Sequence, residues 1–137
     1  MNINDKQDRL IKEFAPLNGW LAKYEYLIDI GQQLPKMEDK CKTAENQIYG
    51  CQSQLWVAAE LRNGKLVFQA DSNTKITRGV IATVLSVINN HTPEDIYQSN
   101  LYFLDNIGFK TNLSPSRLNG LSSIIKRINE LCLIYMQ

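Results

Sequence analysis

The sequence predicts an α+β protein of one compact domain, residues 1–137, with a small antiparallel sheet built on a β-hairpin and packed against several helices. Apolar and polar residues alternate over residues 55–62 and again over 65–71, which predicts two strands. Asn63-Gly64 lies between them and is a strong hairpin signal, because a type I′ turn needs positive φ at both central residues. Apolar residues recur at helical spacing before and after this hairpin, so helices are expected on both sides.

Helix boundaries follow from apolar periodicity and from capping residues. Thr92 and Ser114 each precede a proline, which is the pattern of an N-cap followed by the first helical residue. Gly31 is expected to end the second helix, and residues 106–110 are expected to form a loop. The polar stretch 36–46 is expected to be an exposed connection. The expected helices span about residues 4–14, 20–30, 75–89, a short stretch after Thr92, and 115–135.

Composition and charge restrict the possible partners. Apolar residues make up 44% of the chain and charged residues 21%, which is typical of an ordinary globular protein. The formal net charge of +1 and the lack of a basic cluster interleaved with aromatic residues argue against nucleic acid as a partner. No apolar run approaches the roughly 18 residues of a membrane span, and the N-terminus lacks the apolar region of a signal peptide. We therefore expect a cytoplasmic protein with no membrane partner.

The cysteine pattern argues against a disulfide framework or a closed zinc site. The chain has three cysteines, Cys41, Cys51 and Cys132, and no pair with C-x-x-C spacing. His91 is the only histidine, whereas a structural zinc site usually takes four Cys or His ligands. His91 is expected to be a solvated loop residue between Asn89-Asn90 and Thr92-Pro93. Cys132 falls on the core-facing side of the last helix, so it is expected to be structural and inert.

Cys51 stands out because it directly follows Gly50 at the start of the first predicted strand. A thiol at such a junction is a candidate nucleophile, since thiolate fraction and access decide cysteine reactivity. The alternative is that Cys51 is a small apolar residue of the core, which is the commoner fate of a free cysteine. An antiparallel hairpin returns its second strand to the first, so the turn at residues 71–74 is expected beside Cys51. Cys41 lies between two lysines, which could lower its pKa if the three are close.

Three blocks of the sequence together resemble one known family. Residues 46–56 read N-Q-I-Y-G-C-Q-S-Q-L-W, which resembles the N-x-I-x-G-C-Q-S-Q-V-W signature of the SufE family of cysteine-desulfurase partners. Residues 20–35 are similar to the family's W-x-x-K-Y…L-P region, and residues 113–121 to its L-T-P-S-R-x-x-G-L segment. The blocks keep their order and spacing across almost the whole chain. The family often has G-D-S-D where this chain has Ala70-Asp71-Ser72-Asn73, so any role of the last carboxylate is in doubt.

The resemblance implies a SufE-like fold and a sulfur acceptor and carrier of iron–sulfur cluster assembly. Cys51 would accept persulfide sulfur from a PLP-dependent, SufS-like cysteine desulfurase, stimulate that enzyme and pass the sulfur to a SufB-like scaffold. The chain itself would need no cofactor and no metal, and would act as a co-substrate and not as a stand-alone enzyme. Gly50, Gln52, Asp71 and Arg117 are the candidate loop or partner-contact residues. We expect the resting thiol to be shielded until the partner docks.

Two other functions stay open at this point. One is a metal-binding protein resembling an iron–sulfur scaffold, although such a site needs several converging ligands. The other is a redox protein that pairs Cys41 with Cys51, which requires their Cα atoms to lie within about 7 Å.

Overall fold

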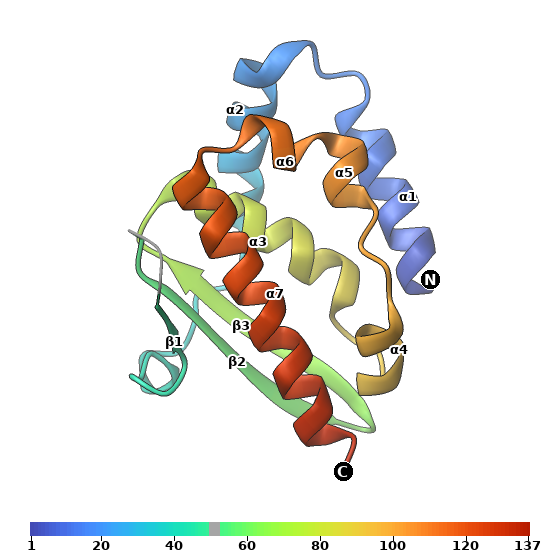
Figure 1. The fold of residues 1–137 in the computed structure, drawn as a ribbon, viewed down its shortest axis with the longest axis vertical. Helices are drawn as coiled ribbons and strands as arrows, with labels where there is room; N and C mark the ends of the chain where they lie inside the picture. Colours follow the sequence, from blue (N-terminus) through green and yellow to red (C-terminus); the bar gives the residue numbers. More distant parts are fainter. Residues whose placement is uncertain (50–52) are drawn as a thin grey trace.

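Helices pack against a three-stranded antiparallel sheet in the computed structural model, which describes residues 1–49 and 53–137 (Figure 1). The α+β class is confirmed. In chain order the elements are α1 (Ile3–Phe14), α2 (Gly19–Gln33), the 3₁₀ turn η1 (Asp39–Cys41), β1 (Gln47–Ile48), β2 (Leu55–Arg62), β3 (Lys65–Ser72), α3 (Lys75–Ile88), α4 (Pro93–Gln98), α5 (Phe103–Ile107), α6 (Phe109–Asn112) and α7 (Pro115–Tyr135). None of the helices in the described ranges is both long and apolar enough to span a membrane.

The predicted hairpin is confirmed as β2 and β3. Asn63 has φ 53° and Gly64 has φ 81°, the left-handed conformation that the turn requires. The strands pair in register from Arg62–Lys65 at the turn to Leu55–Ser72 at the far end. The short strand β1 was not predicted, and it pairs antiparallel with the far end of β2 through Gln47–Trp56 and Ile48–Leu55.

Helix α3 forms the centre of the core, and ten of its residues are buried. It packs against α1, α2, α7 and β3, so most of its sides are covered by protein. A helix that is apolar on nearly every side is buried in this way. The sheet contributes the alternate, inward-facing residues of its strands to the same core, among them Leu55, Val57, Leu66, Phe68 and Ala70.

The sequence pattern predicts that Gly31 ends α2, and this prediction is wrong. The helix continues to Gln33 and ends where Leu34 adopts an extended conformation before Pro35. Gly31 instead allows close contact with α3, because a Cβ at this position would lie 2.8 Å from the backbone nitrogen of Gly79. Gly79 makes a similarly close contact with α2, because a Cβ at this position would lie 2.1 Å from the carbonyl oxygen of Leu27. The two helices therefore pack backbone against backbone.

One expected loop is wrong, and one expected connection is confirmed except at a single residue. Residues 106–110 are not a loop but contain the end of α5 and the start of α6, separated at Gly108 with φ 96°. Burial of Phe109 holds this short helix on the core. The stretch 36–46 is mostly exposed, as expected, but Met37 is fully buried and η1 contacts β2. Burial of Phe109 and of Met37 follows from long-range packing, which local composition does not predict.

His91 is not the solvated loop residue that was expected. Its carbonyl accepts a hydrogen bond from the Leu66 amide at 2.9 Å, which extends the pairing of β3. The ring is half-buried, and its Nε2 atom is buried without a hydrogen-bond partner in the described part of the chain. Burial lowers the pKa of His91, and the nearby charge of Lys6 adds to this effect.

The predicted cap at Thr92 is confirmed, because its hydroxyl accepts a hydrogen bond from the Asp95 amide at 3.1 Å.

Candidate functional site

The candidate site lies where β1, the start of β2 and the end of β3 meet. Ile48 pairs with Leu55, so residues 49–54 connect two paired strands and β1–β2 is a second antiparallel hairpin. Gly50, Cys51 and Gln52 belong to this connection and lie outside the described residues. Their predicted roles therefore stay predictions. Sequence reasoning missed β1 because two residues are too short to show a period.

The residues that follow Cys51 are anchored to the turn between β3 and α3. The Gln54 amide donates to Asn73 Oδ1 at 2.9 Å, and the Asn73 amide donates to the Gln54 carbonyl at 3.3 Å. The hydroxyls of Ser53 and Thr74 are 3.3 Å apart. For Ser53 and Gln54 this confirms the prediction that the returning strand brings the 71–74 turn to this end of the sheet.

The two departures from the family pattern in this turn fit the structure. Asn73 supplies a side-chain oxygen to the Gln54 amide, and an amide oxygen accepts such a bond as a carboxylate does. Ala70 lies in β3 opposite Val57 and is buried, in the extended conformation that any residue adopts. A glycine is therefore not required there.

Asp71 is buried and forms ion pairs with two cations. Its Oδ2 lies 2.8 Å from Lys42 Nζ, and its Oδ1 lies 3.1 Å from Arg78 Nε. Burial favours a raised pKa for Asp71, but the bond from Lys42, the bond from the Ser72 amide and the charge of Arg78 together lower its pKa below the ordinary value. The carboxylate is therefore ionised at neutral pH.

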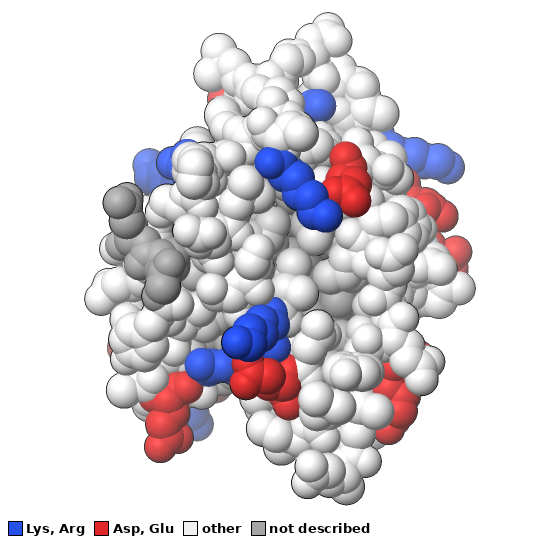
Figure 2. All heavy atoms as spheres, viewed as in Figure 1, with Lys and Arg blue, Asp and Glu red and all other residues white. Residues whose placement is uncertain are grey.

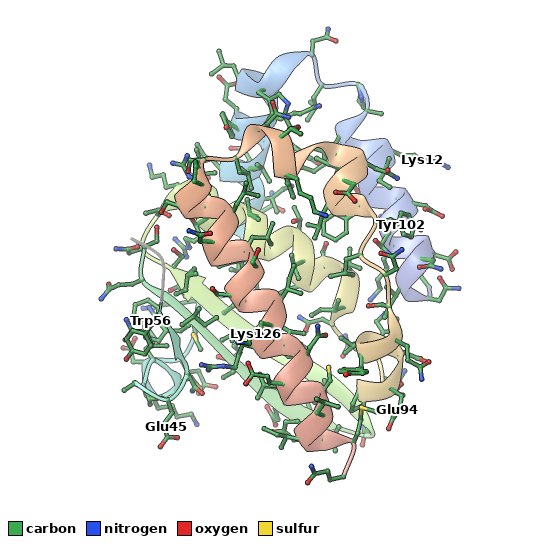
Figure 3. All side chains as sticks on the ribbon, viewed as in Figure 1. Lys12, Glu45, Trp56, Glu94, Tyr102 and Lys126 are labelled. Atoms are coloured by element: carbon green, nitrogen blue, oxygen red, sulfur yellow. The ribbon has the colours of Figure 1, made fainter. Side chains whose placement is uncertain are left out.

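Lys42 also lies 5.3 Å from the centre of the Trp56 ring, and Trp56 is opposite Asp71 across the sheet. Trp56 lies beside the segment that carries η1 (Figure 3). The cluster of Lys42, Trp56, Asp71 and Arg78 joins that segment, both long strands and the first turn of α3. Sequence reasoning missed Lys42 here, because its position near Cys41 gave no indication of its contact with β3.

Arg117 lies in the first turn of α7, where its amide donates to the Ser114 hydroxyl at 3.3 Å. Arg117 is one of the residues around a small cavity, together with Leu55 of β2 and Thr77 of α3. The structure thus brings Arg117 to the same end of the sheet as the 49–54 connection. Asp71 does not line this cavity, so the two predicted residues occupy different places around the site.

The other two cysteines have different surroundings. Cys132 is fully buried, and burial raises the pKa of its thiol to about 11, which confirms that it is structural. Cys41 is half-buried at the end of η1, and its carbonyl accepts from the Asn46 side chain at 2.8 Å. Whether Cys41 can pair with Cys51 depends on a residue outside the described ranges.

Within residues 1–49 and 53–137, His, Cys, Asp and Glu side chains form no cluster of three that could hold a metal ion.

Positive and negative side chains are interspersed on the face shown in Figure 2, with no extended area of one sign. This arrangement accords with the formal net charge of +1. The viewed face therefore offers no strongly basic surface of the kind that binds a nucleic-acid backbone.

Replacing Asn73 with alanine is expected to loosen the anchor of Gln54. The change removes one hydrogen bond worth about 1 kcal/mol, so the Gln54 amide should exchange with solvent roughly fivefold faster. Hydrogen exchange followed by NMR measures this directly. Asn73→Asp keeps an accepting oxygen and should exchange like the parent protein. Equal protection in the alanine variant would show that the backbone pair alone holds Gln54.

Fold and site together define a class of protein: a small α+β domain with a cysteine in the connection between its first two strands, anchored on one side to a helix start. The family model described as "SufE: Fe-S metabolism associated domain" matches residues 8–132. The chain therefore belongs to the SufE family, and this membership supports a role in iron–sulfur metabolism.

Relatives and a solved structure agree with this assignment. An uncharacterized SufE-like protein of Rhizobium etli is 34% identical over 128 residues, which cover 90% of this chain and 86% of the relative. A second, from Rhizobium meliloti, is 35% identical over 126 residues, covering 88% of this chain and 90% of the relative. The solution structure of a hypothetical protein from Thermus thermophilus superimposes with a TM-score of 0.78 at 16% identity, over 96% of each chain, and supports the fold alone.

Proposed function

We propose that this protein is a sulfur acceptor and carrier, which takes a sulfur atom from a PLP-dependent cysteine desulfurase onto Cys51 and delivers it to an iron–sulfur scaffold. Family membership supports the setting in iron–sulfur metabolism. Cys51 is the one thiol of the segment that resembles the family's signature. The PLP stays on the desulfurase, and this chain supplies a thiol and a docking surface.

The observation that carries the proposal is the anchoring of the segment around Cys51. On one side Ile48 is paired in the sheet, and on the other Gln54 is bonded to Asn73. A transfer thiol must be presented to another protein's persulfide in a defined geometry, and fixed flanks on both sides serve that need. The other cysteines are less suited, since Cys132 is fully buried and Cys41 lies in η1, outside the segment that resembles the signature.

The transfer is a thiolate attack on a sulfur–sulfur bond, as in thiol–disulfide exchange. The Cys51 thiolate attacks the terminal sulfur of the desulfurase persulfide and forms a new sulfur–sulfur bond. The bond between that sulfur and the desulfurase cysteine breaks, and the desulfurase cysteine leaves as a thiolate. No electron is gained or lost overall, so the step needs no redox cofactor. The protein is consumed and regenerated as a co-substrate, and it accelerates the desulfurase by removing its persulfide.

The proposal is tested by intact-mass measurement after incubation with a SufS-like desulfurase, PLP and L-cysteine. The wild-type protein should gain the mass of one sulfur atom, and Cys51→Ser should gain none. Cys41→Ser and Cys132→Ser serve as matched controls and should gain sulfur as the wild type does. The rate of cysteine consumption by the desulfurase should rise with the wild-type protein and not with Cys51→Ser.

Other outcomes of these measurements would favour the redox pair or the metal-binding scaffold instead. Sulfur that still loads onto Cys51→Ser would overturn Cys51 as the acceptor. Loss of loading in Cys41→Ser, with a Cys41–Cys51 disulfide in the oxidised protein, would favour the redox pair. Iron or zinc that copurifies in stoichiometric amount and is lost with Cys51 would favour a metal-binding scaffold.

A further inference from the structure

One edge of β2 has no neighbouring strand along the half that leads to the hairpin turn. The sheet order is β1-β2-β3, and β1 pairs only with the first two residues of β2. The Val57 amide still donates to the Asn46 carbonyl at 3.0 Å, which is the last backbone bond on this side of β2 in the described part of the chain. From there to Arg62 no other strand lies beside this edge (Figure 1). This half of β2 is therefore an open edge.

The backbone groups of Leu61 face this open edge. Leu61 lies opposite Leu66 of β3. The Leu66 amide and carbonyl are both bonded on the far side of β3, to His91 at 2.9 Å and to Asn90 at 3.0 Å. The two residues are therefore a pair without mutual hydrogen bonds, so the amide and carbonyl of Leu61 point away from β3. Among the described residues no backbone group bonds to either of them. A strand edge with free amide and carbonyl groups is a template for another strand.

Exposed apolar side chains lie beside the free backbone of Leu61. Leu61 is 45% exposed, although it shares the inward face of the sheet with the buried Val57. The last turn of α7 reaches the same edge, because the Tyr135 hydroxyl donates to the Ala59 carbonyl at 3.2 Å. Ile134 of this turn is 61% exposed. Two apolar side chains are thus available to a partner that pairs with the edge.

Ile134 is on the side of α7 that faces this edge. It lies seven positions, about two turns, after Arg127 and therefore on the same side of the helix. The Arg127 guanidinium donates to the Glu45 carbonyl at 3.0 Å, and β1 begins two residues after Glu45. The side of α7 that carries Arg127 and Ile134 thus faces the edge of the sheet on which β1 lies.

The charges beside Leu61 are complementary to those of a second copy of the chain. Glu60 and Arg62 flank Leu61 on the outer face of the sheet, where their side chains pair at 2.8 Å and are 58% and 57% exposed. In an antiparallel pair of two copies centred on Leu61, Glu60 of each copy lies directly opposite Arg62 of the other. A centre at Glu60 or at Arg62 would place like charges opposite each other. The charge pattern therefore favours a single register of self-pairing.

We propose that two copies of this protein associate through the open edges of β2, as a two-fold symmetric, antiparallel strand pair centred on Leu61. The Leu61 amide of each copy donates to the Leu61 carbonyl of the other. The Leu61 side chains meet on the inward face beside Ile134, and two Glu60–Arg62 pairs form on the outer face. The contact is small, so the dissociation constant should be roughly 0.1 mM and the protein should be monomeric at micromolar concentration. The inference goes beyond the proposed function and does not depend on it.

Sedimentation equilibrium from about 10 µM to about 1 mM tests the proposal. The wild-type protein should shift from monomer to dimer over this range. Glu60→Arg and Arg62→Glu each place like charges opposite each other at two positions, so each should raise the dissociation constant about tenfold. An equimolar mixture of these two variants should dimerise like the wild type, because one chain then supplies two arginines and the other two glutamates. The double variant Glu60→Arg/Arg62→Glu exchanges the charges within one chain and should also dimerise.

Lys110→Glu is the matched control. It makes the same charge change as Arg62→Glu in another exposed ion pair, that of Lys110 with Asp105, and should leave the dissociation constant unchanged. Leu61→Lys places a charge at the centre of the contact and should abolish the dimer. All of the substituted side chains are exposed, and circular dichroism establishes that each variant is folded.

A wild-type protein that remains monomeric at about 1 mM would overturn the proposal. So would a dimer that the charge variants leave unchanged, or one that their mixture does not restore. A monomeric wild type whose binding to a desulfurase is lost in Leu61→Lys would assign the edge to an extended segment of that enzyme and exclude the second copy.

Discussion

Replacing Gly79 with alanine is expected to lower the free energy of unfolding by about 3 kcal/mol. The added Cβ would lie 2.1 Å from the Leu27 carbonyl oxygen and 2.9 Å from the Leu27 Cβ. Both of these atoms belong to α2. Helix propensity alone predicts the opposite sign, because alanine stabilises a helix interior by up to about 1 kcal/mol relative to glycine. The steric cost is larger, since α2 must move away from α3 and the core opens between them.

Urea unfolding followed by far-UV circular dichroism measures this effect. Ser122→Ala is the matched control, because Ser122 is an exposed residue of α7 and its loss should change the free energy by less than about 0.5 kcal/mol. A Gly79→Ala protein as stable as the parent would mean that α2 does not pack on α3 at this distance. Close packing of the two helices would then no longer explain the glycine at position 31.

Replacing Asp71 with asparagine is expected to lower the free energy of unfolding by about 2–3 kcal/mol at neutral pH. The variant keeps the size of the side chain but leaves Lys42 and Arg78 without their shared counter-charge. Removing one partner of a buried ion pair typically costs about 3–5 kcal/mol. We expect a smaller value because the Lys42 and Arg78 side chains are 26% and 33% exposed and can turn partly to water.

The same pair of proteins should differ in pH dependence. The pKa of Asp71 is lower in the folded protein than its ordinary value near 4, so its stabilising effect is complete above that value. The effect is lost as the pH falls through the folded-state pKa. Wild-type stability should therefore fall on acidification below about pH 4, and the gap to Asp71→Asn should narrow.

Urea unfolding at neutral pH and at a series of acidic pH values measures both effects. Glu60→Gln is the control, since Glu60 pairs with Arg62 at the exposed surface and such pairs contribute little to stability. Its unfolding curve should match the wild type at neutral pH. A gap between wild type and Asp71→Asn that stays constant through the acidic range would argue that Asp71 is not the ionised centre of this cluster.

The elements that the sequence predicted correctly depend on neighbours along the chain. The hairpin turn at Asn63-Gly64 follows from backbone conformation, and the start of α7 follows from a cap and a proline. The position of Asn73 beside Gln54 follows from antiparallel pairing, which any such hairpin imposes. Cys51 was selected by its family signature, and the described residues on both sides of it form an anchored connection.

The features that the sequence did not predict depend on which distant surfaces meet. Gly31 has the composition signal of a helix end, yet packing against Gly79 decided its role. Residues 106–110 resemble a loop, but burial of Phe109 holds them in helices. Lys42 contacts Asp71, which is 29 positions away in the chain. The spacing of apolar residues within one helix or strand does not predict such an ion pair.

By itself the sequence determined the class of fold, the turn and cap positions, the family and the cysteine that we propose carries sulfur. The periodicity, the backbone preferences and the signature at residues 46–56 are all properties of residues that are close together in the chain. Only the tertiary structure decided that Asp71 is paired with two cations and that Thr77 and Arg117 share a cavity. The physical reason is that burial and electrostatic partners are set by the packing of β3, α3 and α7, whose contacting residues lie far apart in the chain.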